Sequence, residues 1–68
     1  MIYNIADDYI NLEKLSHIGI IDHDYFWVIL DGISFTIRIP DASTEEIIKQ
    51  RSKLIEAWKE FKLREESE

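Results

Sequence analysis

Few residues of this chain belong to the types that perform chemistry, and their spacing matches no catalytic or metal-binding motif. The sequence has no cysteine and two histidines, which excludes disulfides, thiolate ligands for zinc and cysteine nucleophiles. Asp22, His23 and Asp24 are adjacent in what should be a turn, where neighbouring side chains rarely converge on one ion. His17 has no serine nucleophile and orienting acid that can be assigned to it. We therefore predict no catalytic residue, no metal site and no cofactor.

The residues that stand out are suited to recognition rather than to reaction. Most of them lie in a β-rich run that has a tyrosine and a tryptophan at alternate positions, and arginines lie nearby. Aromatic residues edged by arginine are the composition expected in the core of a protein interface. Exposed together on one face of a sheet, they form the kind of apolar patch that monomeric proteins avoid. The predicted interface residues are Ile21, Tyr25, Trp27, Ile29, Arg38 and Arg51.

Arg51 is in this group because it falls inside the apolar arc of a predicted helix. A charge in such a position is costly unless it is paired or reaches solvent. If its role is structural, we expect its guanidinium to meet Asp22, Asp24 or solvent. If its role is recognition, we expect it to meet a partner or a second subunit.

An Asp-Gly pair at positions 31–32 separates two β-rich runs and predicts a two-residue hairpin, because a type I′ turn needs positive φ at both central positions. Leu30 then pairs with Ile33, and paired residues share a face of the sheet. One face, which we call the inner face, should be core. Its residues are Phe26, Val28, Leu30, Ile33, Phe35, Ile37 and Ile39. The opposite, outer face carries Tyr25 opposite Arg38, Trp27 opposite Thr36, and Ile29 opposite Ser34.

Residues 16–22 predict a strand before this hairpin. A three-residue loop, Asp22–Asp24, would place Ile21 on the outer face and turn Ile18 and Ile20 toward the core. A two-residue loop would reverse the faces of this strand. We expect the three-residue loop because it buries two isoleucines.

Ser43 followed by Glu46 is a capping-box pattern that marks the start of a helix. Apolar residues then recur at helical spacing over an arc of roughly 140°, which is typical of a helix that packs on a sheet. The arc contains Ile47, Ile48, Leu54, Ile55, Trp58 and Phe61. The predicted fold is one α+β domain over residues 1–68, in which an antiparallel meander of three to four strands packs on one C-terminal helix. The expected elements are strands at about 9–12, 16–22, 25–31 and 33–39 and a helix at about 43–64.

The N-terminal residues leave two alternatives open. Residues 1–5 have the pattern of a further edge strand, and residues 1–12 together carry enough apolar side chains to fold back over the outer face. If they do not cover that face, a second copy or another partner should.

The charge balance bears on partners and location. Fourteen acidic and eight basic side chains give a formal charge of −6, whereas a nucleic-acid site needs clustered lysine and arginine. No apolar run is long enough for a bilayer span. We therefore expect no nucleic-acid partner, no membrane partner and a cytoplasmic location. Self-association is also favoured, because one core of this size supplies only ~3 to 5 kcal/mol without a disulfide or a metal.

The order of elements supplies a resemblance. Residues 9–18, which read Tyr-Ile-Asn-Leu-Glu-Lys-Leu-Ser-His-Ile, a strand, an Asp-Gly hairpin and a C-terminal helix resemble short uncharacterised proteins of bacteriophages and integrated elements of Gram-positive bacteria. The order also resembles the small flagellar FlbD-like proteins, although residues 22–26, Asp-His-Asp-Tyr-Phe, replace the Pro-Asp-Thr-like turn usual there. The first resemblance implies a mobile-element protein that acts by binding in the host cytoplasm. No functional residue is carried over.

Three functions follow as hypotheses. The first is a non-enzymatic, homo-oligomeric interaction module with an accessory or assembly role, which could also bind a host or phage protein through its outer face. The second is an inhibitor of a host defence protein whose acids imitate phosphates, namely Asp7, Asp8, Asp22, Asp24 and Asp31. The third is capture of a small ligand at a subunit junction by His17, Arg38 and Arg51.

Overall fold

Five strands and one helix make up the protein in a computed structural model that describes residues 2–5 and 8–66. An antiparallel pair is formed by β1 (Ile2–Ile5) and β2 (Asp8–Asn11). A three-stranded antiparallel sheet follows, with the order β3 (Leu15–Asp22), β4 (Tyr25–Leu30) and β5 (Ile33–Arg38), and the chain continues into α1 (Thr44–Glu66). The predicted α+β class, with an antiparallel sheet packed on one C-terminal helix, is confirmed. The two N-terminal strands form a sheet of their own rather than extending the meander.

The hairpin between β4 and β5 has the predicted turn and register. Asp31 and Gly32 have φ angles of 52° and 79°, the positive values that a type I′ turn requires. Leu30 pairs with Ile33, and the pairing continues without a shift to Tyr25 opposite Arg38. The division of this hairpin into an inner and an outer face is therefore confirmed.

The turn between β3 and β4 differs from the prediction. Asp22 pairs with Tyr25, so the loop has two residues, and His23 takes the positive φ of 55° that such a turn needs. The pairing register then shifts between Ile18 and Ile21, and an extra residue in one strand reverses the alternation of its side chains. The shift brings Ile18 to the inner face and leaves Ile20 74% exposed, so the predicted burial of Ile20 is wrong.

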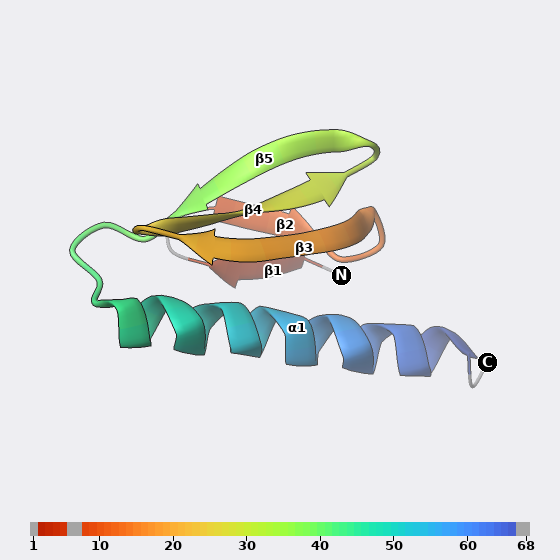
Figure 1. Ribbon diagram of the computed structural model, residues 1–68. Helices are drawn as coiled ribbons and strands as arrows, with labels where there is room; N and C mark the ends of the chain where they lie inside the picture. The colour runs from red at the N-terminus through yellow and green to blue at the C-terminus, as the bar shows by residue number, and fades with distance from the viewer. Residues whose placement is uncertain (1, 6–7, 67–68) are drawn as a thin grey trace.

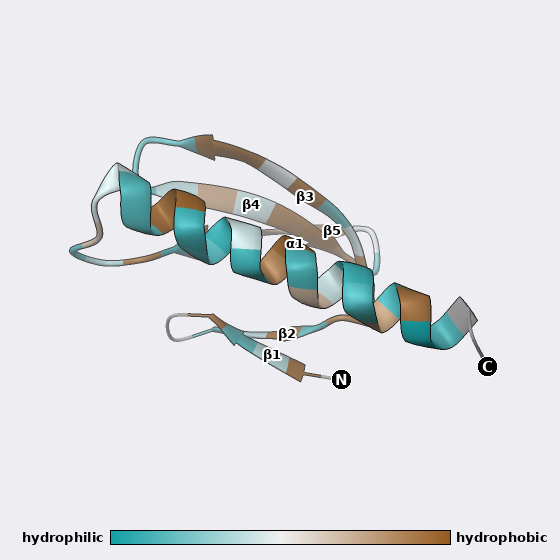
Figure 2. Cartoon of the chain, turned by 90° about the horizontal axis from the view of Figure 1, so that it is seen from below, coloured by the Kyte–Doolittle hydropathy of each residue, from teal (hydrophilic) through white to brown (hydrophobic). Residues whose placement is uncertain are grey.

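The core lies where the inner face of the three-stranded sheet, the β1–β2 pair and α1 meet. Its buried residues are Ile5, Ile10, Leu12, Leu15, Ile18, Phe26, Val28, Ile37, Ile47 and Leu54. Figure 1 shows α1 beneath both sheets, with the β1–β2 pair behind the three-stranded sheet. Seen from below in Figure 2, the three-stranded sheet lies to one side of α1 and the β1–β2 pair to the other. The helix packs chiefly along β1 and β3. An edge strand in residues 1–5 is confirmed for Ile2–Ile5, and Met1 lies outside the described residues.

The predicted start of the helix is confirmed, but only one of the two hydrogen bonds of a capping box is formed. The Glu46 backbone N–H donates to the Ser43 hydroxyl over 3.2 Å, while the Glu46 carboxylate accepts a 2.9 Å hydrogen bond from Gln50 instead of capping the backbone. Ile48 is exposed rather than buried, so the core-facing stripe is narrower than predicted.

No helix in residues 2–5 and 8–66 is both long and apolar enough to cross a membrane.

Candidate functional site

The outer face of the three-stranded sheet carries Tyr25, Trp27 and Ile29, as predicted. All three side chains are half-buried, and none belongs to the group of apolar residues that packs on the core. The β1–β2 pair contributes Ile5 and Ile10 to the core on the opposite side, so the alternative that residues 1–12 cover the outer face is wrong. None of the elements described here lies over this face.

Trp27 is held flat on the outer face by its own sheet. A Cβ atom added to Gly19 would lie 2.5 Å from Cε2 of Trp27, so the indole rests directly on the glycine backbone. The ring of His17 also lies beside the indole, with 5.3 Å between ring centroids and a tilt of 35°. Gly19 is therefore required by this close approach, and the indole forms a flat apolar platform.

Tyr25 anchors a polar corner of the same face. The Arg38 guanidinium carbon lies 5.9 Å from the centroid of the tyrosine ring, and Arg38 Nε lies 3.9 Å from an Asp24 carboxylate oxygen. The Tyr25 hydroxyl donates to Asp22 over 3.3 Å. Arg38 thus edges the aromatic residues, as the interface prediction required, and its side chain is 64% exposed although it is already near Asp24.

Ile21 and Arg51 are not where the interface prediction placed them. Ile21 pairs with Phe26 and packs against the core, because the two-residue turn reverses its face. Arg51 Nε donates a 2.7 Å hydrogen bond to the carbonyl oxygen of Gly19. A partner for Arg51 is thereby confirmed, but it is the backbone of the irregular stretch of β3 and not an acid of the β3–β4 turn.

A second uncovered apolar surface lies on β5, and sequence reasoning placed it in the core. Ile33 and Phe35 are on the inner face but are 59% and 46% exposed, whereas Ile37 on the same strand is 3% exposed. The reason is tertiary, since α1 packs along β1 and β3 and leaves the first half of β5 beyond its cover. As the last strand of its sheet, β5 also presents an unpaired backbone edge.

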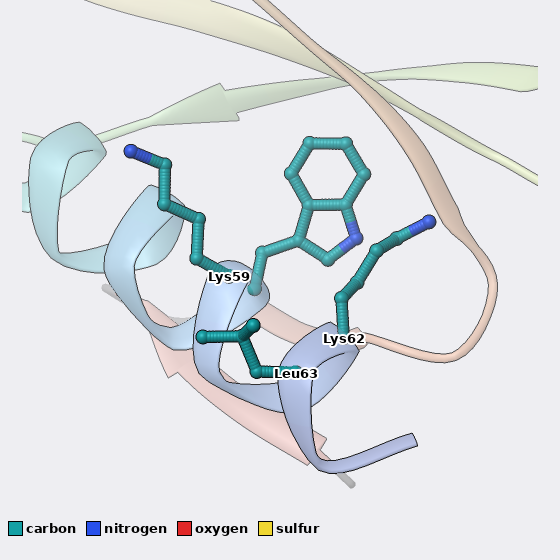
Figure 3. A pocket seen from close by; sticks show the side chains of 4 residues that line it. Lys59, Lys62 and Leu63 are labelled. Atoms are coloured by element: carbon teal, nitrogen blue, oxygen red, sulfur yellow. The ribbon is translucent and has the colours of Figure 1, made fainter. Parts of the chain in front are cut away.

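A pocket of about 410 Å³ lies on the last turns of α1, lined by Trp58, Lys59, Lys62 and Leu63. Figure 3 shows Lys59 and Lys62 extending from the helix in different directions, with the shorter side chain of Leu63 beside them. Lys62 Nζ is 5.3 Å from the centroid of the Trp58 ring, a cation–π distance. The indole nitrogen of Trp58 is buried and has no hydrogen-bond partner among the described residues. The sequence carried a signal for this pocket, because Lys62 falls inside the apolar arc of the helix.

The acids proposed to imitate phosphates do not all lie together, because Asp31 is separated from the acids of the β3–β4 turn. Asp22 and Asp24 precede β4 and Asp31 follows it, so they lie at opposite ends of a six-residue strand. Asp31 also has Lys14 at 3.4 Å. Asp7 of the predicted phosphate-like set lies outside the described residues. Within the part of the chain that the structure describes, no three acidic or histidine side chains could hold a metal ion together.

The strongest candidate site thus has two parts on the three-stranded sheet, the aromatic outer face and the edge strand β5 with its uncovered inner-face residues. Its groups supply flat apolar area, an exposed guanidinium and unpaired backbone donors and acceptors, which are the means of binding another polypeptide. No family model, curated protein or solved structure that was compared with this chain matches it.

Proposed function

We propose that the chain is a non-enzymatic protein-interaction module that associates with itself through its three-stranded sheet. The observation that carries the proposal is the apolar surface left uncovered on that sheet, on the outer face and along β5. It has two parts: Tyr25, Trp27 and Ile29 lie on the outer face, and Ile33 and Phe35 lie on the inner face of β5, at the edge of the sheet. Removing such side chains from water stabilises a complex by ~25 cal/mol per Å² of apolar area before the costs of association.

The geometry favours a polypeptide partner over a small ligand. A small-ligand site is usually a concave pocket with convergent polar groups, but His17 lies against Trp27 and Arg51 is bonded to the backbone of β3. The separation of Asp31 from the acids of the β3–β4 turn likewise gives no support to phosphate imitation. The resemblance to mobile-element proteins adds to the proposal an accessory or assembly role in a bacterial cytoplasm.

The proposal is tested by sedimentation velocity from low to high micromolar concentration. We expect the wild-type mass to rise above the 8.1 kDa of one chain. At least one of Trp27→Glu and Phe35→Glu should return it to 8.1 kDa, because each places a charge on the uncovered surface. Tyr9→Glu, at an exposed position of β2, is the matched control and should leave the mass unchanged. A wild-type chain that stays at 8.1 kDa at high micromolar concentration would contradict the proposal.

A further inference from the structure

We infer that two copies of the chain join through β5, which pairs antiparallel with β5 of the second copy around a two-fold axis at Phe35. The result is one continuous six-stranded sheet. This inference rests on the proposed function, since it names the occupant of the uncovered surface and the register in which that occupant binds.

The backbone of β5 is prepared for such pairing. In a two-residue hairpin the residues that flank the turn form a hydrogen-bonded pair, and bonded and non-bonded pairs then alternate. Since Leu30 and Ile33 flank the turn, the N–H and C=O groups of Ser34, Thr36 and Arg38 point to the free edge. Natural edge strands are commonly blunted by lysine, proline or a bulge. Residues 33–37 contain no lysine or proline, and the register of β5 has no shift.

Symmetry and side-chain exposure then select the register. A two-fold axis normal to the sheet keeps the inner faces of both copies on one side, so directly opposed residues must both be even-numbered or both odd-numbered. Two registers satisfy this condition and pair most of β5. The register centred on Thr36 leaves Ile33 outside the pairing. The register centred on Phe35 places Phe35 against its counterpart and Ile33 against Ile37 of the second copy, so it covers both exposed apolar residues.

The charges at the ends of β5 suit a second copy in the same register. Arg38 lies at the end of the strand and Asp31 just before its start. In the pairing centred on Phe35, Arg38 lies opposite Gly32 of the second copy and therefore beside its Asp31. Both side chains are more than half exposed, and the two-fold axis creates the contact twice. The edge is thus self-complementary in charge as well as in apolar surface.

Association through the outer face is less favourable than association through β5. Trp27 is already half-buried against Gly19 and His17, so further burial gains less there. Ile33 is more exposed than Trp27. Pairing at β5 also adds backbone hydrogen bonds, which packing of two outer faces against each other does not. We therefore expect Phe35→Glu, and not Trp27→Glu, to be the variant that separates the copies.

The absence of cysteine from the sequence permits a direct test by crosslinking. Phe35→Cys should form a disulfide dimer on mild oxidation, because non-bonded antiparallel pairs bring Cα atoms to ~4.5 Å, within disulfide range. The matched control is Ile20→Cys on the other edge strand, which is more exposed than Phe35 and should stay monomeric. Crosslinking at Ile20 as fast as at Phe35 would overturn the inference.

Charge reversal gives a second test that does not depend on a cysteine at the axis. Arg38→Asp and Asp31→Arg should each weaken self-association about tenfold by placing like charges together. Mixing the two variants should restore association, because both charge contacts become attractive again in the mixed dimer. A wild-type dimer whose mixed variants do not recover would overturn the β5 pairing and leave the proposed function standing. A wild-type monomer would remove both.

Discussion

Gly19 and Trp27 depend on each other, because the indole occupies the space that any larger side chain at position 19 would need. We expect Gly19→Ala to destabilise the fold by about 1 to 3 kcal/mol, the usual cost of overpacking. Urea denaturation followed by circular dichroism measures this change. The added methyl would stand 2.5 Å from the ring, so Trp27 must move away from position 19.

A double-mutant cycle separates this clash from backbone effects. In a Trp27→Ala background, Gly19→Ala should cost much less, because the ring it meets is gone. An equal cost in both backgrounds would show that the loss arises from the backbone of β3 and not from the indole.

Arg51 links the helix to the irregular stretch of β3. We expect Arg51→Leu to lower the free energy of unfolding by about 1.5 to 3 kcal/mol, because the substitution removes the charged donor from the partly buried carbonyl oxygen of Gly19. Gln50→Leu, on the neighbouring helix position, is the control, because its partner Glu46 lies on the same helix. An unchanged denaturation midpoint for Arg51→Leu would show that water replaces the guanidinium at no cost.

The position of Arg51 could be predicted from the sequence, but its partner could not. Helical spacing alone places residue 51 among apolar neighbours, which already indicates a partner. The acceptor is the Gly19 carbonyl, and it becomes available in a stretch where the register of β3 shifts. No local signal marks that shift. A two-residue turn alone would place Ile18 on the outer face, and the extra residue of β3 returns Ile18 to the core.

Among the elements, the β4–β5 hairpin depends on the backbone of Gly32. We expect Gly32→Val to destabilise the fold by more than ~1 kcal/mol, because a β-branched residue tolerates positive φ poorly. Gly32→Asn is the matched control and should cost less, since asparagine enters the left-handed region readily. No side chain lies near the missing Cβ, so a large effect of the valine must come from backbone strain. Equal midpoints for the two variants would contradict this account.

The elements with strong local signals were predictable, and those set by tertiary packing were not. The Asp31–Gly32 turn and the Ser43 cap lie within a few residues of the structure they determine. The pairing of β1 with β2 into a separate sheet depends instead on Ile5 and Ile10 reaching the core. The same holds for β5, where the alternating pattern identified the inner face but could not show that α1 packs along β1 and β3 and leaves Ile33 and Phe35 uncovered.

The whole molecule carries a formal charge of −6, so duplex DNA and RNA should not bind measurably at physiological salt. The basic residues of α1 are interspersed with glutamates and give no continuous basic stripe. An electrophoretic shift assay checks this expectation. Submicromolar affinity that falls steeply with added salt would contradict it.

Amide hydrogen exchange of β5 shows whether a second copy of the chain buries this strand. The amides of Ser34 and Thr36 face the free edge in one copy, whereas those of Ile33 and Phe35 bond to β4 and serve as internal controls. Exchange is measured by NMR at low and at high micromolar concentration. We predict that the Ser34 and Thr36 amides become protected as concentration rises, while the two control amides stay protected throughout. Rapid exchange at Ser34 and Thr36 in samples whose mass exceeds that of one chain would contradict the pairing of β5 with a second copy.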